Sequence, residues 1–231
     1  MCLIVTREKN STWVPTLEEQ SNAWQSNPHG FGAGWINRKG RLVFQKTMEE
    51  KEVEKIIASI PEGSPFILHW RLATHGDRSV RNCHPFPCLG NSWLAAHNGI
   101  LSKQPLVEGL TDSESYLRTL KGTEPNLRKV EKDIARLGYG KIAFLSGKGE
   151  IRIANEAEGE WREDTVWQSN GGLDSVPWYS SGFGGWRPTI GLSARAIRCD
   201  ACLTHAPLYR SGNMYLCADC ATEQEGGEWI R

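Results

Sequence analysis

The sequence contains no uninterrupted apolar run near the ~20 residues that a membrane-spanning helix needs, so it gives no sign of a membrane protein. It also has no net charge, because 27 Lys and Arg residues balance 27 Asp and Glu residues. Proteins that bind nucleic acid over a broad surface usually carry a basic excess, so the composition disfavours that function class. The apolar stretch in residues 1–7 is too short for a signal peptide, which favours a cytoplasmic protein.

A secreted disulfide framework is excluded by the cysteines. Seven are present, an odd number, and four of them form two C-x-x-C pairs, which indicates a metal site rather than paired disulfides. The rest of the composition is ordinary for a folded protein, with 39% hydrophobic, 9% aromatic and 23% charged residues in 231. That length accommodates one full-sized domain and a small appendage.

Apolar patterning predicts an α+β domain in which strand pairs are covered by helices. Strands are expected at 2–6, 34–36, 42–44, 65–72, 93–96, 141–145 and 150–154. Helices are expected at 49–60, 112–120 and 126–137. Residues 171–191 are rich in Gly, Ser and Pro without a clear period and are predicted to form a surface segment or linker.

Three polar motifs are expected where strands end. They are His-Trp-Arg-Leu-Ala-Thr-His-Gly at 69–76, Ala-His-Asn-Gly-Ile-Leu at 96–101 and Thr-Asp-Ser-Glu at 111–114. Taken singly, they fit a surface arginine, an Asn-Gly turn and a helix N-cap. Cys2 gives them a different meaning, because removal of Met1 before a small residue would leave a thiol and a free α-amine on one residue, a nucleophile together with its base. Alone, Cys2 would fit a buried cysteine in a first strand.

Together and in this order, Cys2 and the three motifs resemble the class II glutamine amidotransferases. These N-terminal-nucleophile hydrolases take ammonia from the side-chain amide of glutamine, and the pattern is similar to that of the glutaminase domain of glucosamine-6-phosphate synthase. The resemblance covers roughly residues 2–190. It implies a four-layer α-β-β-α sandwich over residues 2–192.

The resemblance also implies roles for single residues. Cys2 would attack the amide carbon and form a γ-glutamyl thioester, while the Asn98 side chain and the Gly99 backbone N–H would form the oxyanion hole. His75 and His97 are expected to have structural or hydrogen-bonding roles rather than acid–base roles.

Substrate recognition would rest on a charged pair. Arg71 would bind the α-carboxylate of free glutamine and Asp112 its α-ammonium group. Thr74, His75 and Gly76 would line the same pocket. Catalysis of this kind needs no cofactor.

The sequence departs from the synthase pattern in two places. Leu72 stands where the synthase has an aromatic residue, which puts synthase-type gating of ammonia in doubt. Nothing after residue 190 resembles a synthase domain, so the expected function is a stand-alone glutaminase subunit that passes ammonia to a separate acceptor enzyme. An amidoligase, a nucleobase-modifying amidotransferase and a sugar-aminating enzyme all remain open as acceptors.

A small zinc ribbon is predicted over residues 193–231. Its ligands would be Cys199, Cys202, Cys217 and Cys220. Four thiolates in a closed tetrahedral set indicate a structural site, with a rubredoxin-like iron site as the minor alternative and His205 as a bystander. The segment contains four arginines and no lysine, against two aspartates and three glutamates, so its net charge is slightly negative. This charge suits protein docking or scaffolding better than phosphate binding.

Two other functions stay open on the sequence. One is an N-terminal-nucleophile amidase with a different amide substrate, which the presence of both Arg71 and Asp112 disfavours. The other is a non-catalytic scaffold that acts through its ribbon, which the presence of Cys2, Asn98 and Gly99 disfavours.

Overall fold

The computed structural model describes residues 2–73, 77–174, 208–211 and 214–217. The chain divides into two compact units, residues 1–180 and 181–231. The boundary expected at 192–193 lies outside the described residues. Within the described ranges, no helix is long and apolar enough to cross a membrane.

The first unit contains a six-stranded antiparallel sheet with the strand order β3-β2-β4-β1-β10-β9. Its strands are β1 (Leu3–Arg7), β2 (Phe31–Ile36), β3 (Leu42–Thr47), β4 (Phe66–Trp70), β9 (Glu160–Glu163) and β10 (Val166–Gln168). Every residue of β1 and of β4 is buried, because these two strands lie in the middle of the sheet and are covered on both faces.

A second antiparallel sheet of four strands has the order β5-β6-β7-β8. Its strands are β5 (Phe86–Cys88), β6 (Trp93–Ile100), β7 (Tyr139–Ser146) and β8 (Ile151–Ala154). An inter-sheet core that includes Ile4, Ile67 and Leu145 packs the two sheets against each other.

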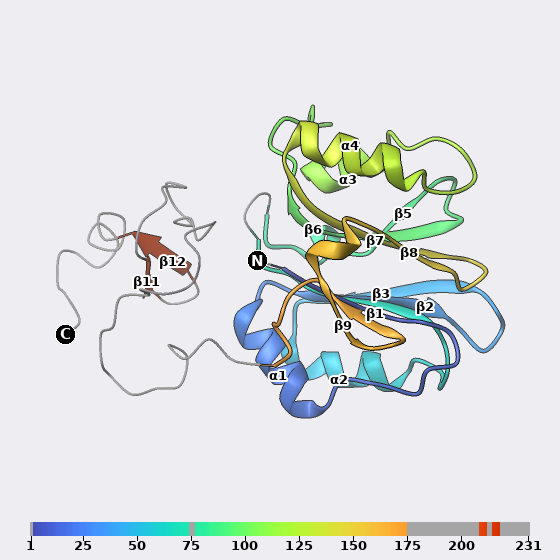
Figure 1. Cartoon of the computed structure of the whole chain (residues 1–231). Helices are drawn as coiled ribbons and strands as arrows, with labels where there is room; N and C mark the ends of the chain where they lie inside the picture. The colour runs from blue at the N-terminus through green and yellow to red at the C-terminus, as the bar shows by residue number, and fades with distance from the viewer. Residues whose placement is uncertain (1, 74–76, 175–207, 212–213, 218–231) are drawn as a thin grey trace. The chain divides into compact units, whose positions relative to one another are not determined.

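Helices cover the two outer faces of the stacked sheets (Figure 1). They are α1 (Leu17–Ser26), α2 (Glu50–Ala58), α3 (Asp112–Leu117) and α4 (Leu127–Leu137), with the short 3₁₀ turns η1 (Val80–Asn82) and η2 (Glu156–Glu158). Each pair of helices has its own apolar core, with Val53 and Ile57 of α2 against the large sheet and Val130 and Ile134 of α4 against the small one. The first unit is therefore a four-layer α-β-β-α sandwich.

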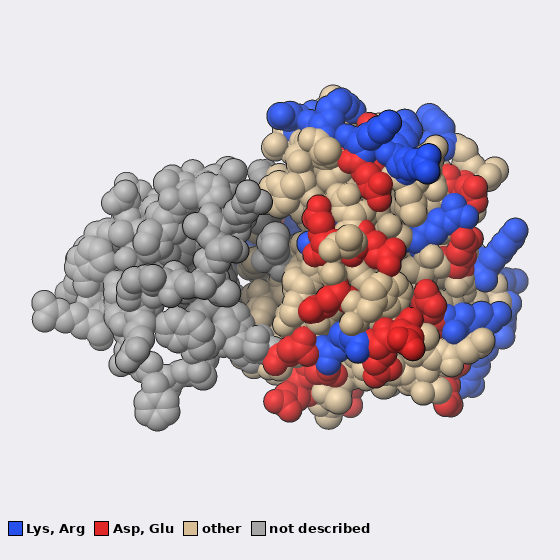
Figure 2. All heavy atoms as spheres, viewed as in Figure 1, with Lys and Arg blue, Asp and Glu red and all other residues tan. Residues whose placement is uncertain are grey.

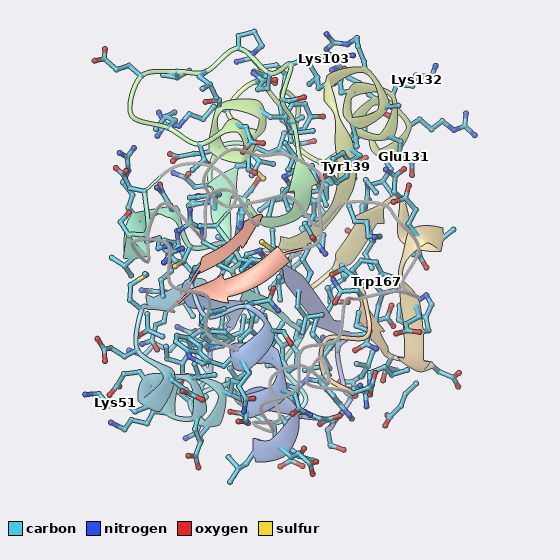
Figure 3. The ribbon with its side chains drawn as sticks, turned by 90° about the vertical axis from the view of Figure 1, so that its left-hand side faces the viewer. Lys51, Lys103, Glu131, Lys132, Tyr139 and Trp167 are labelled. Atoms are coloured by element: carbon cyan, nitrogen blue, oxygen red, sulfur yellow. The ribbon has the colours of Figure 1, made fainter. Side chains whose placement is uncertain are left out.

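Basic side chains gather on one of the outer helical layers. Figure 2 shows Lys and Arg gathered over the helical layer of the small sheet, where α4 contributes Arg128, Lys129, Lys132 and Arg136. Figure 3 shows Lys132 at this end of the domain and Lys51 of α2 at the opposite end. The two helical layers thus form the two ends of the domain.

The expected α+β architecture is confirmed, and the strands expected at 34–36 and 42–44 and at 141–145 and 150–154 pair as hairpins, but several elements were missed or misplaced. No prediction covered α1, β5, β9 or β10. β6 continues to Ile100 instead of ending at residue 96, so the Asn-Gly motif lies inside a strand. Residues 171–174 pack on the domain, with Leu173 fully buried, rather than beginning a linker.

Candidate active site

Cys2 lies immediately before β1, where the pairing of β1 with β4 brings it beside Leu72. The Leu72 N–H donates to Cys2 Sγ at 3.3 Å, and the thiol donates to the Leu72 carbonyl at 3.4 Å. Burial raises the pKa of the Cys2 thiol, although the Leu72 backbone and the Arg71 charge act in the opposite direction. The resting thiol is therefore protonated, and its use as a nucleophile requires a nearby base.

Arg71 follows β4 directly and is fixed by its own backbone. Its N–H donates to the Gly30 carbonyl at 2.8 Å, and its carbonyl accepts from the His29 N–H at 2.9 Å. Its side chain is buried, with Nη1 donating to the Asp77 carbonyl at 3.1 Å. Burial lowers the pKa of Arg71, and the neighbouring Cys2 is among the groups that oppose this shift. A buried guanidinium close to the thiol can attract an anionic substrate group.

Asn98 and Gly99 lie in the second half of β6, opposite Lys141 and Gly140 of β7. The Asn98 side chain is 2% exposed, and its Nδ2 donates to Ser169 Oγ at 2.8 Å. These residues were expected beyond the end of a strand. The structure corrects this expectation, and a position within a paired strand holds both residues more rigidly than a turn would.

Gly99 is a glycine because the space at this point is already filled. A Cβ atom on Gly99 would lie 2.2 Å from the Tyr139 carbonyl oxygen and 2.7 Å from His97 Nε2. No real side chain tolerates such distances, so any larger residue would push β6 away from β7. Glycine at this position keeps the backbone of β6 where the site needs it.

Asp112 is the first residue of α3, and its carboxylate is held by two backbone N–H groups. Oδ2 accepts from the Leu101 N–H at 2.7 Å, and Oδ1 accepts from the Ser113 N–H at 2.7 Å. Ser113 Oγ also lies 2.8 Å from His97 Nδ1. These contacts place the Asp112 carboxylate just beyond the end of β6, at Leu101, which is two residues after Gly99.

Two residues that sequence reasoning missed connect the two halves of the site. Ser169 contacts Asn98, and Asn170 Nδ2 donates to the Cys2 carbonyl at 2.8 Å. Both follow the buried strand β10, which no sequence pattern had predicted, so the sequence offered no signal for them. Through them the structure connects Cys2, next to β1 of the large sheet, with Asn98 in β6 of the small sheet. Thr74, His75 and Gly76 lie outside the described residues.

Buried histidines adjoin these strands. His69 Nε2 lies 3.1 Å from His84 Nδ1, and both rings are buried. Burial lowers the pKa of His69 to about 3, with the nearby Arg71 charge acting in the same direction. Burial also lowers the pKa values of His84 and His97, although the Asp112 charge opposes the shift of His97. All three imidazoles are therefore neutral in the folded protein at pH 7.

Lowering the pH from 7 to 5 is expected to reduce the free energy of unfolding. Between pH 6.5 and about 3, His69 is protonated in the unfolded chain but neutral in the folded domain, so acid favours unfolding over this range. The cost from His69 alone is about 2 kcal/mol at pH 5, and His84 and His97 add to it. Urea unfolding at pH 5, 7 and 8 checks this. The midpoints at pH 7 and 8 should agree, and an unchanged midpoint at pH 5 would contradict the prediction.

Comparisons with known proteins identify the family of the chain. The sequence model of the family described as "Glutamine amidotransferases class-II" matches residues 13–145, more than half of the chain. The chain belongs to the class-II glutamine amidotransferases. The match includes Arg71, Asn98, Gly99 and Asp112, while Cys2 and residues 169–170 lie outside it.

Individual relatives of this amidotransferase chain agree with the family. A Haemophilus influenzae protein named "Putative glutamine amidotransferase" is 28% identical over 153 residues, covering 54% of this chain and 51% of its own. The glutamine–fructose-6-phosphate aminotransferase (isomerizing) of Lactiplantibacillus plantarum is 25% identical over 108 residues, covering 47% of this chain and 16% of its own. The chain thus spans about half of the first relative and a smaller part of the second.

A solved structure shows the same fold. The structure described as the allosteric regulatory enzyme of purine biosynthesis superposes with a TM-score of 0.51 and 16% identity, covering 73% of this chain and 41% of that one. At this identity, the similarity concerns the arrangement of the sheets and helices.

The predicted zinc ligands remain a prediction. Cys199, Cys202 and Cys220 lie outside the described residues, and Cys217 is the last residue of the antiparallel hairpin formed by β11 (Leu208–Ser211) and β12 (Met214–Cys217). Among the residues that the structure describes, no group of three or more His, Cys, Asp or Glu side chains could hold a metal ion.

Proposed function

We propose that this class-II amidotransferase chain hydrolyses free glutamine to glutamate and ammonia through a thioester on Cys2. The observation that carries the proposal is the position of the Cys2 thiol, which lies against the Leu72 backbone next to the buried Arg71. Asn170 contacts the Cys2 backbone carbonyl, and the preceding residue, Ser169, contacts the Asn98 amide on the facing sheet.

The reaction would begin with proton transfer from the Cys2 thiol to its own α-amine, which removal of Met1 exposes. The raised pKa of the thiol makes this base necessary. The sulfur then attacks the amide carbon, and the carbonyl oxygen becomes an oxyanion that Asn98 Nδ2 and the Gly99 N–H stabilise. Collapse of this intermediate returns the proton to the leaving nitrogen and releases ammonia. Water then hydrolyses the thioester to glutamate and restores the thiol.

Specificity for free glutamine would come from Arg71 and Asp112. A free amino acid carries an α-carboxylate and an α-ammonium group, and a glutamine residue within a peptide carries neither. The buried guanidinium of Arg71 suits the carboxylate. The half-buried carboxylate of Asp112, already aligned by the Leu101 and Ser113 N–H groups, suits the ammonium group.

Arg71→Lys is expected to raise KM for glutamine by roughly tenfold to a hundredfold while changing kcat much less. Lysine keeps the charge but loses the bidentate contact, which is similar in the ground state and the transition state. Steady-state glutamate release checks the prediction, with the exposed Arg136→Lys in α4 as a matched control that leaves both constants unchanged. A fall in kcat at constant KM would instead place Arg71 in the chemical step.

We also propose that the ammonia is used by a separate acceptor enzyme. The L. plantarum relative is named for an aminotransferase reaction on fructose-6-phosphate, and this chain matches only 16% of that protein. A partner would carry out the acceptor reaction, with residues 193–231 as the proposed docking segment.

Zinc at the four C-terminal cysteines is proposed to organise that segment. Four thiolates suit tetrahedral Zn²⁺, and the β11–β12 hairpin follows the first C-x-x-C pair and ends at Cys217, the first cysteine of the second pair. The metal would be structural, because a closed set of four ligands leaves no position for a substrate.

Purified protein is expected to contain one zinc ion per chain, and the double variant Cys199→Ser, Cys202→Ser is expected to lose it. Glutamine hydrolysis should change less than about twofold, since the ligands take no part in the chemistry. Atomic emission and glutamate release measure the two effects, and Cys88→Ala should keep the metal. Absence of zinc from the wild type would contradict the ribbon, and loss of glutaminase activity with the metal would show that the ribbon supports the active site.

A further inference from the structure

Ser169 is held in one position by the strand that carries the nucleophile. Its N–H donates to the Ile4 carbonyl at 2.9 Å, and its Oγ accepts from the Ile4 N–H at 2.9 Å. Ile4 lies two residues after Cys2, and the side chain of Ser169 is 1% exposed. The hydroxyl oxygen is thus fixed relative to the start of β1 and cannot be replaced by solvent.

The turn that contains Ser169 is anchored on both sides. The next residue, Asn170, donates to the Cys2 carbonyl and accepts from the Gly172 N–H at 3.1 Å. Further along, Asp174 accepts from Gln168 Nε2 at 3.0 Å and also from Arg162. Trp167 of β10, labelled in Figure 3, is buried directly before this turn. The turn is therefore part of the rigid domain.

The Asn98 side-chain amide makes one hydrogen bond, through its nitrogen, whereas its buried oxygen has no donor among the described residues. Nδ2 donates to Ser169 Oγ at 2.8 Å, while no donor among the described residues reaches the buried Oδ1. The two ends of a primary amide have nearly the same shape, so a half-turn exchanges them without moving other atoms. After the half-turn, the Ser169 hydroxyl donates to Oδ1, and Nδ2 points in the direction that Oδ1 had before.

This second arrangement uses every hydrogen-bonding group of Ser169. The oxygen accepts from the Ile4 N–H and the hydroxyl proton goes to Asn98, whereas in the first arrangement the oxygen accepts twice. It also leaves an unpartnered buried donor on Asn98, which is costly unless a substrate oxygen uses it. The substrate carbonyl oxygen, which becomes an oxyanion, is an acceptor for this Asn98 donor. In the first arrangement, Asn98 Oδ1 would instead point toward the negative charge and repel it.

We propose that Ser169 is a positioning residue of the oxyanion hole: by donating its hydroxyl proton to Asn98 Oδ1, it turns Asn98 Nδ2 toward the oxygen of the glutamine amide. This inference rests on the proposed glutaminase function. Ser169 itself touches neither the substrate nor the reacting atoms. Its effect is to favour the one amide orientation that stabilises the tetrahedral intermediate.

Steady-state kinetics of the full chain with Met1 removed test the proposal. Ser169→Ala is expected to lower kcat for glutamine by about tenfold or more with KM changed less than about twofold, because the orientation of the Asn98 amide matters only where the oxyanion forms, in the transition state. Ser169→Thr, which keeps the hydroxyl, should recover most of kcat. In an Asn98→Ala background, Ser169→Ala should lower kcat by less than about twofold further, because Ser169 acts through Asn98.

The control is Ser64→Ala, which removes another buried serine hydroxyl, one that donates to the Ile36 carbonyl at 2.7 Å, and should leave kcat unchanged. A wild-type kcat in Ser169→Ala would overturn the inference, as would an equal loss in the Asn98→Ala background. If Ser169→Ala does not fold, Ser169→Cys replaces it, because cysteine has a similar size and is a weaker donor. A wild-type kcat in Ser169→Cys, or an equal loss in the Asn98→Ala background, would likewise overturn the inference. A wild-type protein that releases no glutamate would instead overturn the proposed function itself.

Discussion

Replacing Cys2 by alanine is expected to abolish glutamate release, lowering kcat by about four orders of magnitude or more. No other described thiol can take its place. Burial raises the pKa of Cys83 and raises that of Cys88 to about 12, and both thiols are buried. Of the three cysteines whose burial the structure describes, Cys2 is the half-buried one, and it lies next to Arg71 and the turn that contacts Asn98. Release of glutamate from glutamine by the purified protein measures the effect.

The matched control for this experiment is Cys88→Ala. It removes a buried thiol from the core beneath α3 and α4, at some cost in stability, but should keep kcat within about twofold. Thermal unfolding of both variants separates loss of fold from loss of chemistry. Wild-type activity in Cys2→Ala would disprove the thioester mechanism.

Replacing Asn98 by alanine is expected to lower kcat by roughly a hundredfold to a thousandfold with little change in KM. The amide would stabilise charge that exists only in the tetrahedral intermediate, so its loss costs about 3 kcal/mol in the transition state and little in the ground state. The side chain is almost fully buried and has a fixed partner, so alanine cannot be compensated by a nearby group. Glutamate release over a range of glutamine concentrations separates the two constants.

Asn126→Ala serves as the control for stability. Asn126 caps α4 by accepting from the Lys129 N–H at 3.1 Å, and its loss costs about 1 kcal/mol of stability without touching the site. This variant should keep wild-type kinetics at temperatures where it is folded. A rise in KM without a fall in kcat for Asn98→Ala would place Asn98 in substrate binding and remove it from the oxyanion hole.

The sequence predicted the architecture well where patterns are local. Buried runs such as residues 93–96 and the periodic apolar positions of α4 depend only on neighbouring residues, and both were found. The helix α1 was missed because few of its residues are apolar, and its start depends on a capping box between Thr16 and Glu19. The short strands β9 and β10 were missed because only their partners in the sheet identify them.

The residues of the candidate site also fall into those that a local motif predicts and those that only the fold reveals. Cys2, Arg71, Asn98 and Asp112 could be named because each belongs to a short motif of the family. Ser169 could not, because nothing in the order Gln-Ser-Asn-Gly-Gly indicates a contact with a residue 71 positions earlier. That contact exists because β10 pairs with β1 while β6 lies in the facing sheet. Long-range strand pairing, rather than local propensity, creates this part of the site.

The central claim is that Cys2 attacks the side-chain amide of glutamine, and covalent trapping tests it most directly. The full-length protein is incubated with a glutamine analogue that carries a diazoketone in place of the amide, and its peptides are examined by mass spectrometry. The account predicts one adduct per chain, on the peptide that begins with Cys2 and lacks Met1, and protection by an excess of glutamine. A retained Met1 with no adduct, or an adduct on a different cysteine while glutamine is still hydrolysed, would contradict it.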